Sequence, residues 1–404
     1  MPTNINKAAL EDSEFLMFVL DELAESLEKG GEDVIRLTLG KSEQPLHEDI
    51  INTYIDAIRD QQERNLVYPQ GLPILRGKIA EWYTAWGNPT EADNIIINTG
   101  TSPLFKDLFR LLLGEGNEVL LPHPYYSVYN VSACLTPATI NFYTINPDTF
   151  TIDIGEFREK FNPEKTKLVV LNSPGNPYGN ILSQEDYCKI LDIVDGNAYI
   201  LSDEIYRNVG FGSKVPSILD VKRPSDKVIV SNSFSKGFRM YTARVGFFIA
   251  PDELIKPFRV LLQHTLLTVN PSAQYACAEA LDHLEEVEEL KRLYKERNEY
   301  TVKRLANVKD IRVLKAQGGF YLVILCDDFM DKKEFRSTLE LAKDILKKTG
   351  VAVVPGSDFG IPKGLRLSFT HLRYKEAIDK LHDYFLGHSL NKLGSPQQSD
   401  VVLV

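Results

Sequence analysis

The chain has 404 residues, 43% hydrophobic and 25% charged, a composition typical of a globular protein with a substantial core. Its net charge of −10 argues against nucleic acid or anionic lipid as a partner, and its longest apolar runs are too short to span a membrane. Four scattered cysteines, seven histidines without metal-ligand spacing and a start unlike a signal peptide lead us to expect a cytoplasmic protein without a metal site.

The N-terminal two thirds of the chain alternate between helical and strand patterns. Helical spacing from Phe15 to Leu27 is followed by a predicted strand, Val34–Leu39, that enters a turn at Gly40. Seven further strands are predicted at Ile95–Asn98, Val119–Leu121, Ile140–Tyr143, Leu168–Leu171, Ala198–Ser202, Val228–Asn232 and Val245–Ala250. Helix-length crossovers between most of them predict an α/β fold with a mostly parallel sheet, whose ligands bind at the carboxyl ends of the strands.

The pattern changes after Pro271. A long charged helix, Ser272–Leu305, is predicted first, and strand and helix patterns follow it as an α+β unit. These later elements are Phe320–Leu325, Ser337–Lys348, Val351–Val354, Leu365–Phe369 and Tyr374–Leu386. We therefore expect an N-terminal helix and arm (1–45), a large domain (46–285), a small C-terminal domain completed by part of the N-terminal segment (286–388) and a mobile tail (389–404).

The ends of the predicted strands carry residues that suggest chemistry. Gly100, Thr101 and Ser102 follow the strand Ile95–Asn98 and open a helix. Such a helix N-terminus can bind phosphate through its amides and hydroxyls, and plain helix capping is the alternative. Tyr126 follows the next strand in a prolyl-aromatic turn, where its ring can lie against a planar ligand or pack in the core.

The next two strand ends present polar side chains. Asn176 lies in a loop with two prolines and two glycines and can bond a phenolate oxygen, although a bare turn is the alternative. Asp203 ends the strand Ala198–Ser202, where a buried carboxylate needs a cationic partner. That partner is either a protonated pyridine nitrogen or a structural salt bridge. Tyr206, three residues later, can reach the phenolate side of the same ring.

Lys236 is the most informative residue, because it stands between two predicted core strands. Desolvation and the nearby charges of Arg239 and Arg244 should disfavour its ammonium form. Such a lysine can form a Schiff base with a carbonyl cofactor, whereas an exposed loop lysine is the alternative. Arg366 lies inside the apolar strand Leu365–Phe369, and a bidentate carboxylate from a substrate or from the protein explains it best.

Taken in order, these motifs resemble the class I/II pyridoxal-phosphate aminotransferases of the aspartate aminotransferase fold type. The residues that carry the resemblance are Gly100-Thr101-Ser102, Tyr126, Asn172–Gly179, Asp203, Tyr206, Ser233–Lys236, Arg244 and Arg366. It covers roughly residues 30–388, and Tyr68-Pro69-Gln70-Gly71 is similar to the family's segment that enters the neighbouring subunit. The resemblance implies fold type I, with a large domain that binds the cofactor on a seven-stranded sheet. It also implies a homodimer with shared active sites.

The resemblance implies roles for individual residues. Lys236 would hold pyridoxal 5'-phosphate as a Schiff base and move the proton between the substrate α-carbon and the cofactor. Asp203 would pair with the pyridine nitrogen, Asn176 and Tyr206 would bond the phenolate oxygen, and Tyr126 would stack on the ring. The implied phosphate ligands are Gly100, Thr101, Ser102, Ser233, Ser235, Arg244 and, from the partner chain, Tyr68. The implied ligands of the substrate carboxylate are Arg366, Asn176 and the Gly40 amide.

Three positions depart from the family pattern. The turn that usually reads Gly-x-Pro-Asp is Gly40–Pro45 here, Tyr178 replaces a threonine, and Tyr125 and Tyr126 form a tyrosine pair. Within that turn, Glu43 is either a ligand for a cationic substrate side chain or a solvated carboxylate. The N-terminal helix either closes over the site as a lid or packs on the large domain.

The leading hypothesis is an aminotransferase that acts on an L-amino acid and a 2-oxo acid. The alternative keeps the fold and the cofactor but makes the protein an amino-acid oxidase, for example of arginine, or a β-lyase. The motifs do not separate these reactions, because the same deprotonated substrate can follow each course. A DNA-binding regulator with an aminotransferase-like domain is rejected, since only about 30 residues precede the first strand.

Overall fold

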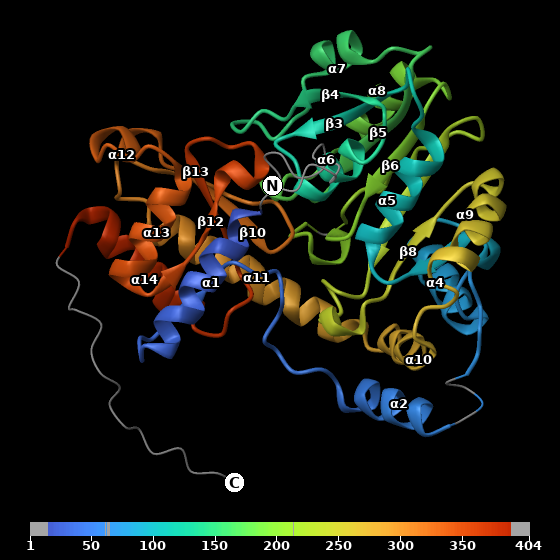
Figure 1. Ribbon diagram of the computed structural model, residues 1–404, viewed down its shortest axis with the longest axis horizontal. Helices are drawn as coiled ribbons and strands as arrows, with labels where there is room; N and C mark the ends of the chain where they lie inside the picture. Colours follow the sequence, from blue (N-terminus) through green and yellow to red (C-terminus); the bar gives the residue numbers. More distant parts are fainter. Residues whose placement is uncertain (1–14, 61, 63–64, 213, 389–404) are drawn as a thin grey trace, which may run out of the picture. The chain divides into compact units, whose positions relative to one another are not determined.

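The computed structural model describes residues 15–388 apart from 61, 63–64 and 213, and these residues form two compact units (Figure 1). The first unit comprises Lys41–Lys295 and Ala316–Phe320. The second comprises Phe15–Gly40, Glu296–Lys315 and residues 321–388. The predicted mobile tail, 389–404, lies outside the described residues.

The first unit is built on a seven-stranded sheet with strand order β2-β8-β7-β6-β5-β3-β4. Its strands are β2 Ile95–Asn98, β3 Glu118–His123, β4 Thr139–Thr144, β5 Thr166–Asn172, β6 Tyr199–Asp203, β7 Lys227–Ser233 and β8 Gly246–Ile249. The pairs from β4 through β3, β5 and β6 to β7 are parallel, and β8 is antiparallel to both β7 and β2. All seven predicted strands are present, and the mostly parallel α/β sheet is confirmed.

Helices of this unit pack on the sheet, whose strands are apolar on both faces, or on a neighbouring helix. They are α2 Glu48–Arg59, α4 Pro73–Ala85, α5 Thr101–Leu112, α6 Ser127–Cys134, α7 Ile154–Lys160, α8 Gln184–Val194, α9 Asp252–Thr265 and α10 Pro271–Ala280. Helix α5 contacts β2, β5, β7 and β8, and its Phe105 and Phe109 join Phe248 in the buried core.

The predicted helix Ser272–Leu305 is wrong as one continuous element. The structure has α10 and then α11, Leu284–Arg304, with a turn between them. The amides of Asp282 and His283 bond back to Glu279 and Ala280, which closes α10. Glu285 and Glu286 lie in the first turn of α11, where the helix dipole favours acidic side chains.

The second unit contains a four-stranded antiparallel sheet of order β12-β13-β10-β9 and a separate parallel pair, β1-β11. The strands are β1 Ile35–Arg36, β9 Arg312–Leu314, β10 Tyr321–Leu325, β11 Val351–Ala352, β12 Val354–Pro355 and β13 Gly364–Ser368. The helices are α1 Leu16–Lys29, α12 Asp327–Lys332, α13 Thr338–Thr349 and α14 Tyr374–Leu386. Helix α1 packs against α13, β11 and β12 of this unit, and the choice between a lid and packing on the large domain stays a prediction.

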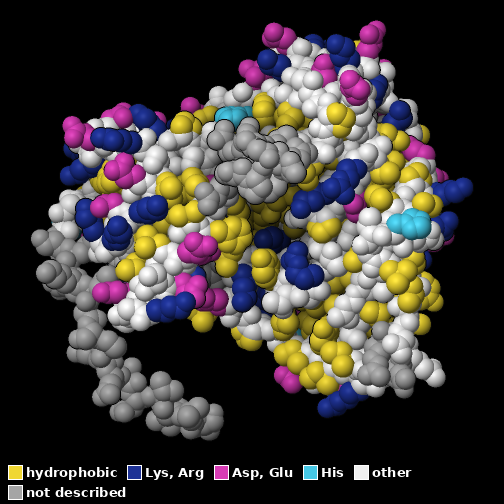
Figure 2. All heavy atoms as spheres, viewed as in Figure 1, with side chains coloured by type: hydrophobic (Ala, Val, Ile, Leu, Met, Phe, Trp, Pro, Cys, Tyr) yellow, Lys and Arg dark blue, Asp and Glu magenta, His cyan; other side chains and the backbone are white. Residues whose placement is uncertain are grey.

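Side chains of both charges cover the surface. On the face shown in Figure 2, acidic and basic groups are scattered among apolar and uncharged ones. Within the described part of the chain, no helix has the length and apolarity needed to cross a bilayer.

Candidate active site

The carboxyl ends of β5, β6 and β7 meet at one edge of the sheet. In the ladder Asn172 is the partner of Asp203, and Asp203 is the partner of Ser231. The Asn172 side-chain amide donates to the main-chain oxygen of Asp203 at 2.9 Å. The register of three neighbouring strands therefore fixes the position of Asp203.

Asp203 is a buried carboxylate with a full set of donors. Tyr129 Oη donates to one carboxylate oxygen, and Ser231 Oγ donates to the other at 2.7 Å. The amide of Ile205 lies 3.4 Å from the same oxygen as Ser231. Burial raises the pKa of Asp203 to about 6, and these hydrogen bonds and the charge of Lys236 oppose the rise. A cation placed beside this carboxylate would therefore be bound strongly.

Sequence reasoning missed Tyr129 and Ser231 as partners of Asp203. Tyr126 is the N-cap of α6 and Tyr129 lies three residues later, and their rings meet edge to face at 5.6 Å. This spacing was the available signal. Ser231 gave none, because only the strand register brings it to Asp203.

Lys236 follows β7 and lies among aromatic rings. Its Nζ is 5.2 Å from the ring centroid of Phe320 and 5.9 Å from that of Tyr206. The Tyr206 ring is buried and meets Phe320 edge to face. Arg239, which we expected to place its charge beside the lysine, instead forms an ion pair with Glu286 of α11. The negative Glu286 offsets much of the effect that Arg239 was predicted to have on Lys236.

A second cluster of donors surrounds the start of α5. Gly100 caps this helix at φ 89°, and among the described side chains none caps its first turn. A Cβ atom at Gly100 would lie 2.6 Å from Arg244 Nη2, so the absence of a side chain lets the guanidinium approach the helix. The start of α5 thus lies beside a cation, as an anion site requires, and the Gly100 amide itself donates to the main-chain oxygen of Asn98 at 2.7 Å.

Two serines complete this cluster. Arg244 Nη1 lies 3.4 Å from Ser235 Oγ and 3.0 Å from the main-chain oxygen of Tyr241. The Ser235 amide donates to Ser233 Oγ at 2.9 Å, and Ser233 Oγ donates to the main-chain oxygen of Val245 at 3.0 Å. The loop after β7 therefore links Lys236 to the donors around Gly100.

The contact between β8 and Gly100 leaves no room for a side chain at Gly246, which makes a stability prediction. A Cβ atom at Gly246 would lie 2.7 Å from both Gly100 C and Thr101 N, which are main-chain atoms. We expect Gly246→Ala to lower the free energy of unfolding by about 1–3 kcal/mol, measured by urea denaturation. Gly77→Ala, in α4 with open space around it, is the matched control and should raise stability by up to about 1 kcal/mol. Equal stabilities of Gly246→Ala and the parent would contradict this.

Asn176 and the tyrosine pair lie at neighbouring strand ends. Asn176 is buried, and its main-chain amide donates to Asn172 Oδ1 at 2.7 Å. Tyr125 stacks on Phe142 of β4 at 5.5 Å, whereas Tyr126 turns to Tyr129. Among the departures from the family pattern, the tyrosine pair is thus divided between packing on the sheet and the surroundings of Asp203.

The remaining predicted residues of the first unit lie at its surface or in its packing. Tyr68 is 40% exposed, and its amide lies 3.4 Å from Thr268 Oγ1. Glu43 is exposed, and the choice between a substrate ligand and a solvated carboxylate stays a prediction. Tyr178 is buried against Phe150, so the residue that replaces the family's threonine has a packing role.

Arg366 lies in β13 of the second unit and is 2% exposed. Its guanidinium stacks 3.9 Å from the ring centroid of Tyr321 and 4.6 Å from that of Phe359. Its Nη2 donates to the main-chain oxygen of Thr38 at 2.7 Å, two residues before Gly40. These contacts fix a planar cation in one orientation, which suits recognition of a carboxylate.

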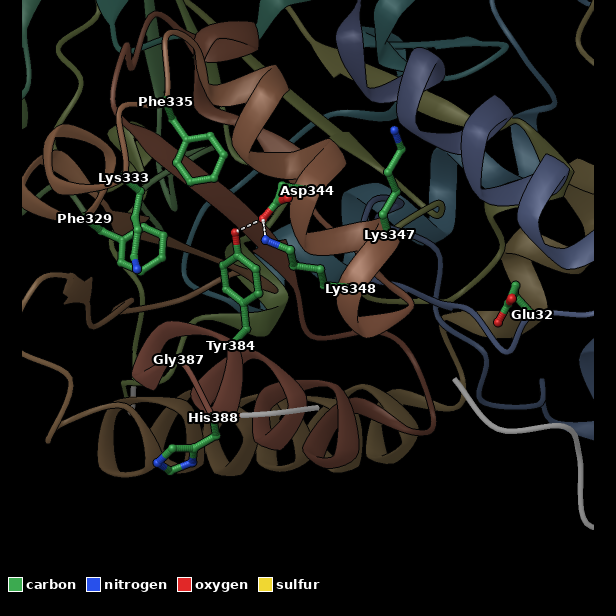
Figure 3. Close-up of a pocket in the computed structure, with 10 residues that line it drawn as sticks. All are labelled: Glu32, Phe329, Lys333, Phe335, Asp344, Lys347, Lys348, Tyr384, Gly387 and His388. Atoms are coloured by element: carbon green, nitrogen blue, oxygen red, sulfur yellow. Dashed lines mark hydrogen bonds and ion pairs between the residues drawn. The ribbon is translucent and has the colours of Figure 1, made fainter. Parts of the chain in front are cut away.

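Two other features lie apart from these groups. A cavity of about 670 Å³ in the second unit is lined by residues such as Phe329, Phe335 and Tyr384, and it contains none of the predicted site residues (Figure 3). His47, Asp49 and His283 bring potential metal-ligand atoms within 4.8 Å of one another. In this cluster His47 Nδ1 accepts the Asp49 amide at 3.2 Å and so caps α2, and the His47 and His283 rings stack with their centroids 4.0 Å apart.

Comparison with known proteins places the chain among transaminases. The family model for class I and II aminotransferases matches residues 32–381. The asparagine–oxo-acid transaminase of Streptococcus mutans is 29% identical over 389 residues, which cover 95% of this chain and 99% of that protein. The aspartate aminotransferase of Thermotoga maritima is 31% identical over 374 residues, which cover 90% of this chain and 95% of that protein.

Solved structures agree with the fold. The aspartate aminotransferase of Thermotoga maritima superposes with a TM-score of 0.84 at 28% identity, covering 95% of this chain and all (100%) of that chain. The alanine aminotransferase of Pyrococcus furiosus has a TM-score of 0.86 at 26% identity, with coverages of 95% and 100%. The predicted fold type I is confirmed.

Proposed function

This chain belongs to the class I and II aminotransferase family, and from that premise we propose a pyridoxal-phosphate enzyme that transfers the α-amino group of an L-amino acid to a 2-oxo acid. The chain is an aminotransferase, since its relatives and structural neighbours are transaminases. They favour transamination over the oxidase and β-lyase alternatives.

The observation that carries the cofactor proposal is the joint placement of a lysine, a buried carboxylate and an anion-binding helix start in one unit. Pyridoxal phosphate has a phosphate, a basic ring nitrogen and an aldehyde, which match these three features. The close approach of Arg244 to Gly100 and the burial of the Asp203 carboxylate, which raises its pKa, both suit such a ligand. When bound, the cofactor supplies an electron sink that acidifies the Cα–H bond of the substrate.

Asp203 and Lys236 would do the central work. Tyr129 and Ser231 orient the Asp203 carboxylate, which would keep a proton on the ring nitrogen. Lys236 Nζ would bind the cofactor covalently and, once the substrate amine has displaced it, carry the proton between the substrate Cα and the cofactor. The ring centroid of Tyr206 lies 5.9 Å from Lys236 Nζ, and the Tyr206 hydroxyl would bond the phenolate oxygen of the cofactor.

The other proposed contacts follow the implied family roles. Asn176 would bond the phenolate oxygen together with Tyr206, and Tyr126 would stack on the ring. The phosphate ligands would be Gly100, Thr101, Ser102, Ser233, Ser235, Arg244 and, from the partner subunit of a homodimer, Tyr68. Arg366 would bind the substrate α-carboxylate, helped by Asn176 and the Gly40 amide. A cytoplasmic location, and the division into a cofactor domain at 46–285 and a C-terminal domain at 286–388, belong to the same proposal.

The test of the function uses the cofactor-loaded protein and a panel of L-amino acids, first without any 2-oxo acid. An aminotransferase should complete one half-reaction, leave the cofactor in its amino form and stop until a 2-oxo acid is added. The measurements are the cofactor spectrum and dissolved oxygen. Continued turnover without a 2-oxo acid would contradict the proposed transamination, and oxygen consumption would identify an oxidase.

Replacing Arg366 tests the carboxylate contact. We expect Arg366→Ala to lower kcat/KM for the best amino donor by about 10²- to 10³-fold, because a buried charge partner is lost. Most of the loss should appear as a higher KM. Arg366→Lys keeps the charge but not the planar fork, and it should recover part of the loss. Unchanged steady-state kinetics in Arg366→Ala would exclude this role.

A further inference from the structure

Helix α1 is capped by a residue from the far end of the chain. The Leu16 amide donates to one oxygen of Asp358 at 2.9 Å, and the Met17 amide donates to the other at 3.0 Å. Asp358 lies in the short 3₁₀ turn Gly356–Phe359 and is 8% exposed. Both carboxylate oxygens therefore accept charge-assisted hydrogen bonds from the start of α1.

The same helix reaches the surroundings of Arg366 by two further routes. The Phe15 ring meets the Phe359 ring edge to face at 6.2 Å, and the other partner of Phe359 is the Arg366 guanidinium. On another side, Asp21 of α1 accepts the Thr38 hydroxyl at 2.7 Å, and the main-chain oxygen of Thr38 accepts Arg366 Nη2. Docked α1 thus stabilises the wall around the arginine at three points.

Asp358 is also a potential competitor for that arginine. The charge of Arg366 acts on the Asp358 carboxylate and lowers its pKa, against the rise that burial causes. If α1 left its place, the carboxylate would lose both donors while it remained largely buried. A buried carboxylate without donors needs a cationic partner. Arg366 is a nearby cation, because its guanidinium stacks on the ring of Phe359, the residue that follows Asp358.

We propose that α1 is a positioning element for Arg366: by holding both oxygens of Asp358, it prevents this carboxylate from competing with the substrate α-carboxylate for the guanidinium. Undocking of α1 then weakens substrate binding through an internal ion pair. The inference rests on the proposed role of Arg366 in substrate binding. Asp358 and α1 are positioning groups and do not take part in the chemistry.

The experiment compares four cofactor-loaded proteins: the parent, Leu20→Ala, Asp358→Ala and the double variant. Leu20 is fully buried on the packed face of α1, so its truncation loosens the helix. For the best donor of the amino-acid panel, Leu20→Ala should raise KM about tenfold with kcat within about twofold of the parent. The double variant should return KM to within about threefold of the parent, because the competing carboxylate is gone.

Amide hydrogen exchange gives an independent readout of α1. Exchange at Leu16 and Met17 should accelerate in Leu20→Ala, in Asp358→Ala and in the double variant. Glu22→Ala, on the exposed face of α1, is the matched control and should change neither KM nor exchange. Asp358→Asn removes the charge and keeps a hydrogen-bond acceptor. When it is combined with Leu20→Ala, it should therefore lower the raised KM as Asp358→Ala does. If Leu20→Ala does not fold, Phe15→Ala replaces it both as the single variant and in the double variant with Asp358→Ala.

A KM in the double variant that is as high as in Leu20→Ala overturns the proposal, since a purely structural Asp358 predicts that the two defects add. Accelerated exchange at Leu16 with an unchanged KM in Leu20→Ala overturns it as well. Arg366→Ala distinguishes a failure of the proposed substrate-binding role of Arg366 from a failure of the proposed role of α1. If Arg366→Ala leaves KM unchanged, the proposed function of Arg366 has failed. If it raises KM while the double variant is not rescued, the present inference alone has failed.

Discussion

Lys236→Ala is expected to lower the transamination rate by about 10⁴-fold or more, since it removes both the covalent attachment and the group that moves the proton. The donors around Gly100 remain, so the variant should still bind the cofactor without a covalent link. Turnover with the best amino donor and a 2-oxo acid measures the first effect. Mass spectrometry after borohydride reduction measures the second, because reduction fixes a covalently attached cofactor to the protein.

The parent should gain the mass of the reduced cofactor and Lys236→Ala should not. Lys222→Ala, an exposed lysine of the same unit, is the control and should behave like the parent in both assays. If Lys236→Ala still gained cofactor mass, the attachment would lie on another residue and the assignment of Lys236 would be wrong.

Asp203→Asn should have two opposite effects, the first of which is a loss of activity. The amide is nearly isosteric and can still accept from Tyr129, but it cannot keep a proton on the ring nitrogen. We expect the rate to fall by about 10²- to 10³-fold, as is typical for loss of a buried, preorganised charge at a reacting centre. Single-turnover loss of the cofactor absorbance with the best amino donor measures this. A rate within a few-fold of the parent would exclude the role of Asp203.

The second effect is a gain of stability in the cofactor-free protein. The folded-state pKa of Asp203 is about 6, above its usual value of 3.8. Folding therefore carries no ionisation penalty below about pH 4, an increasing one between about pH 4 and 6, and the full penalty above that range. This difference corresponds to on the order of 3 kcal/mol, so Asp203→Asn should be more stable than the parent at pH 8 and similar to it near pH 4.

Urea denaturation of the cofactor-free proteins at the two pH values measures this difference. Asp192→Asn, at an exposed carboxylate, is the control and should show much less pH dependence. If Asp203→Asn were less stable than the parent at pH 8, burial would not be the dominant influence on the Asp203 carboxylate.

The sequence was most informative where a short segment determines its own structure. The seven strands of the large sheet were predictable because apolar, β-branched runs alternate with helix-length crossovers. Helix α14 begins and ends at the predicted residues, Tyr374 and Leu386. The order of polar residues at strand ends was enough to indicate the family.

What could not be predicted depends on contacts between distant segments. The pairing of Arg239 with Glu286 joins residues 47 positions apart and offsets a charge that we expected to act on Lys236. The Ser231 contact to Asp203 depends on strand register, and the turn that divides α10 from α11 has no proline to mark it. The expected depression of the Lys236 pKa stays a prediction.

The second unit joins the two ends of the chain, and this has a consequence for protein synthesis. The Ile35 amide bonds the Gly350 oxygen, and the Ser368 amide bonds the Leu37 oxygen at 3.0 Å. On the ribosome, Ile35 and Leu37 emerge before these partners, which follow only after more than 300 further residues have been added. The apolar face of this segment therefore lacks these partners through most of translation, and exposed apolar surface of this kind makes a nascent chain prone to aggregation.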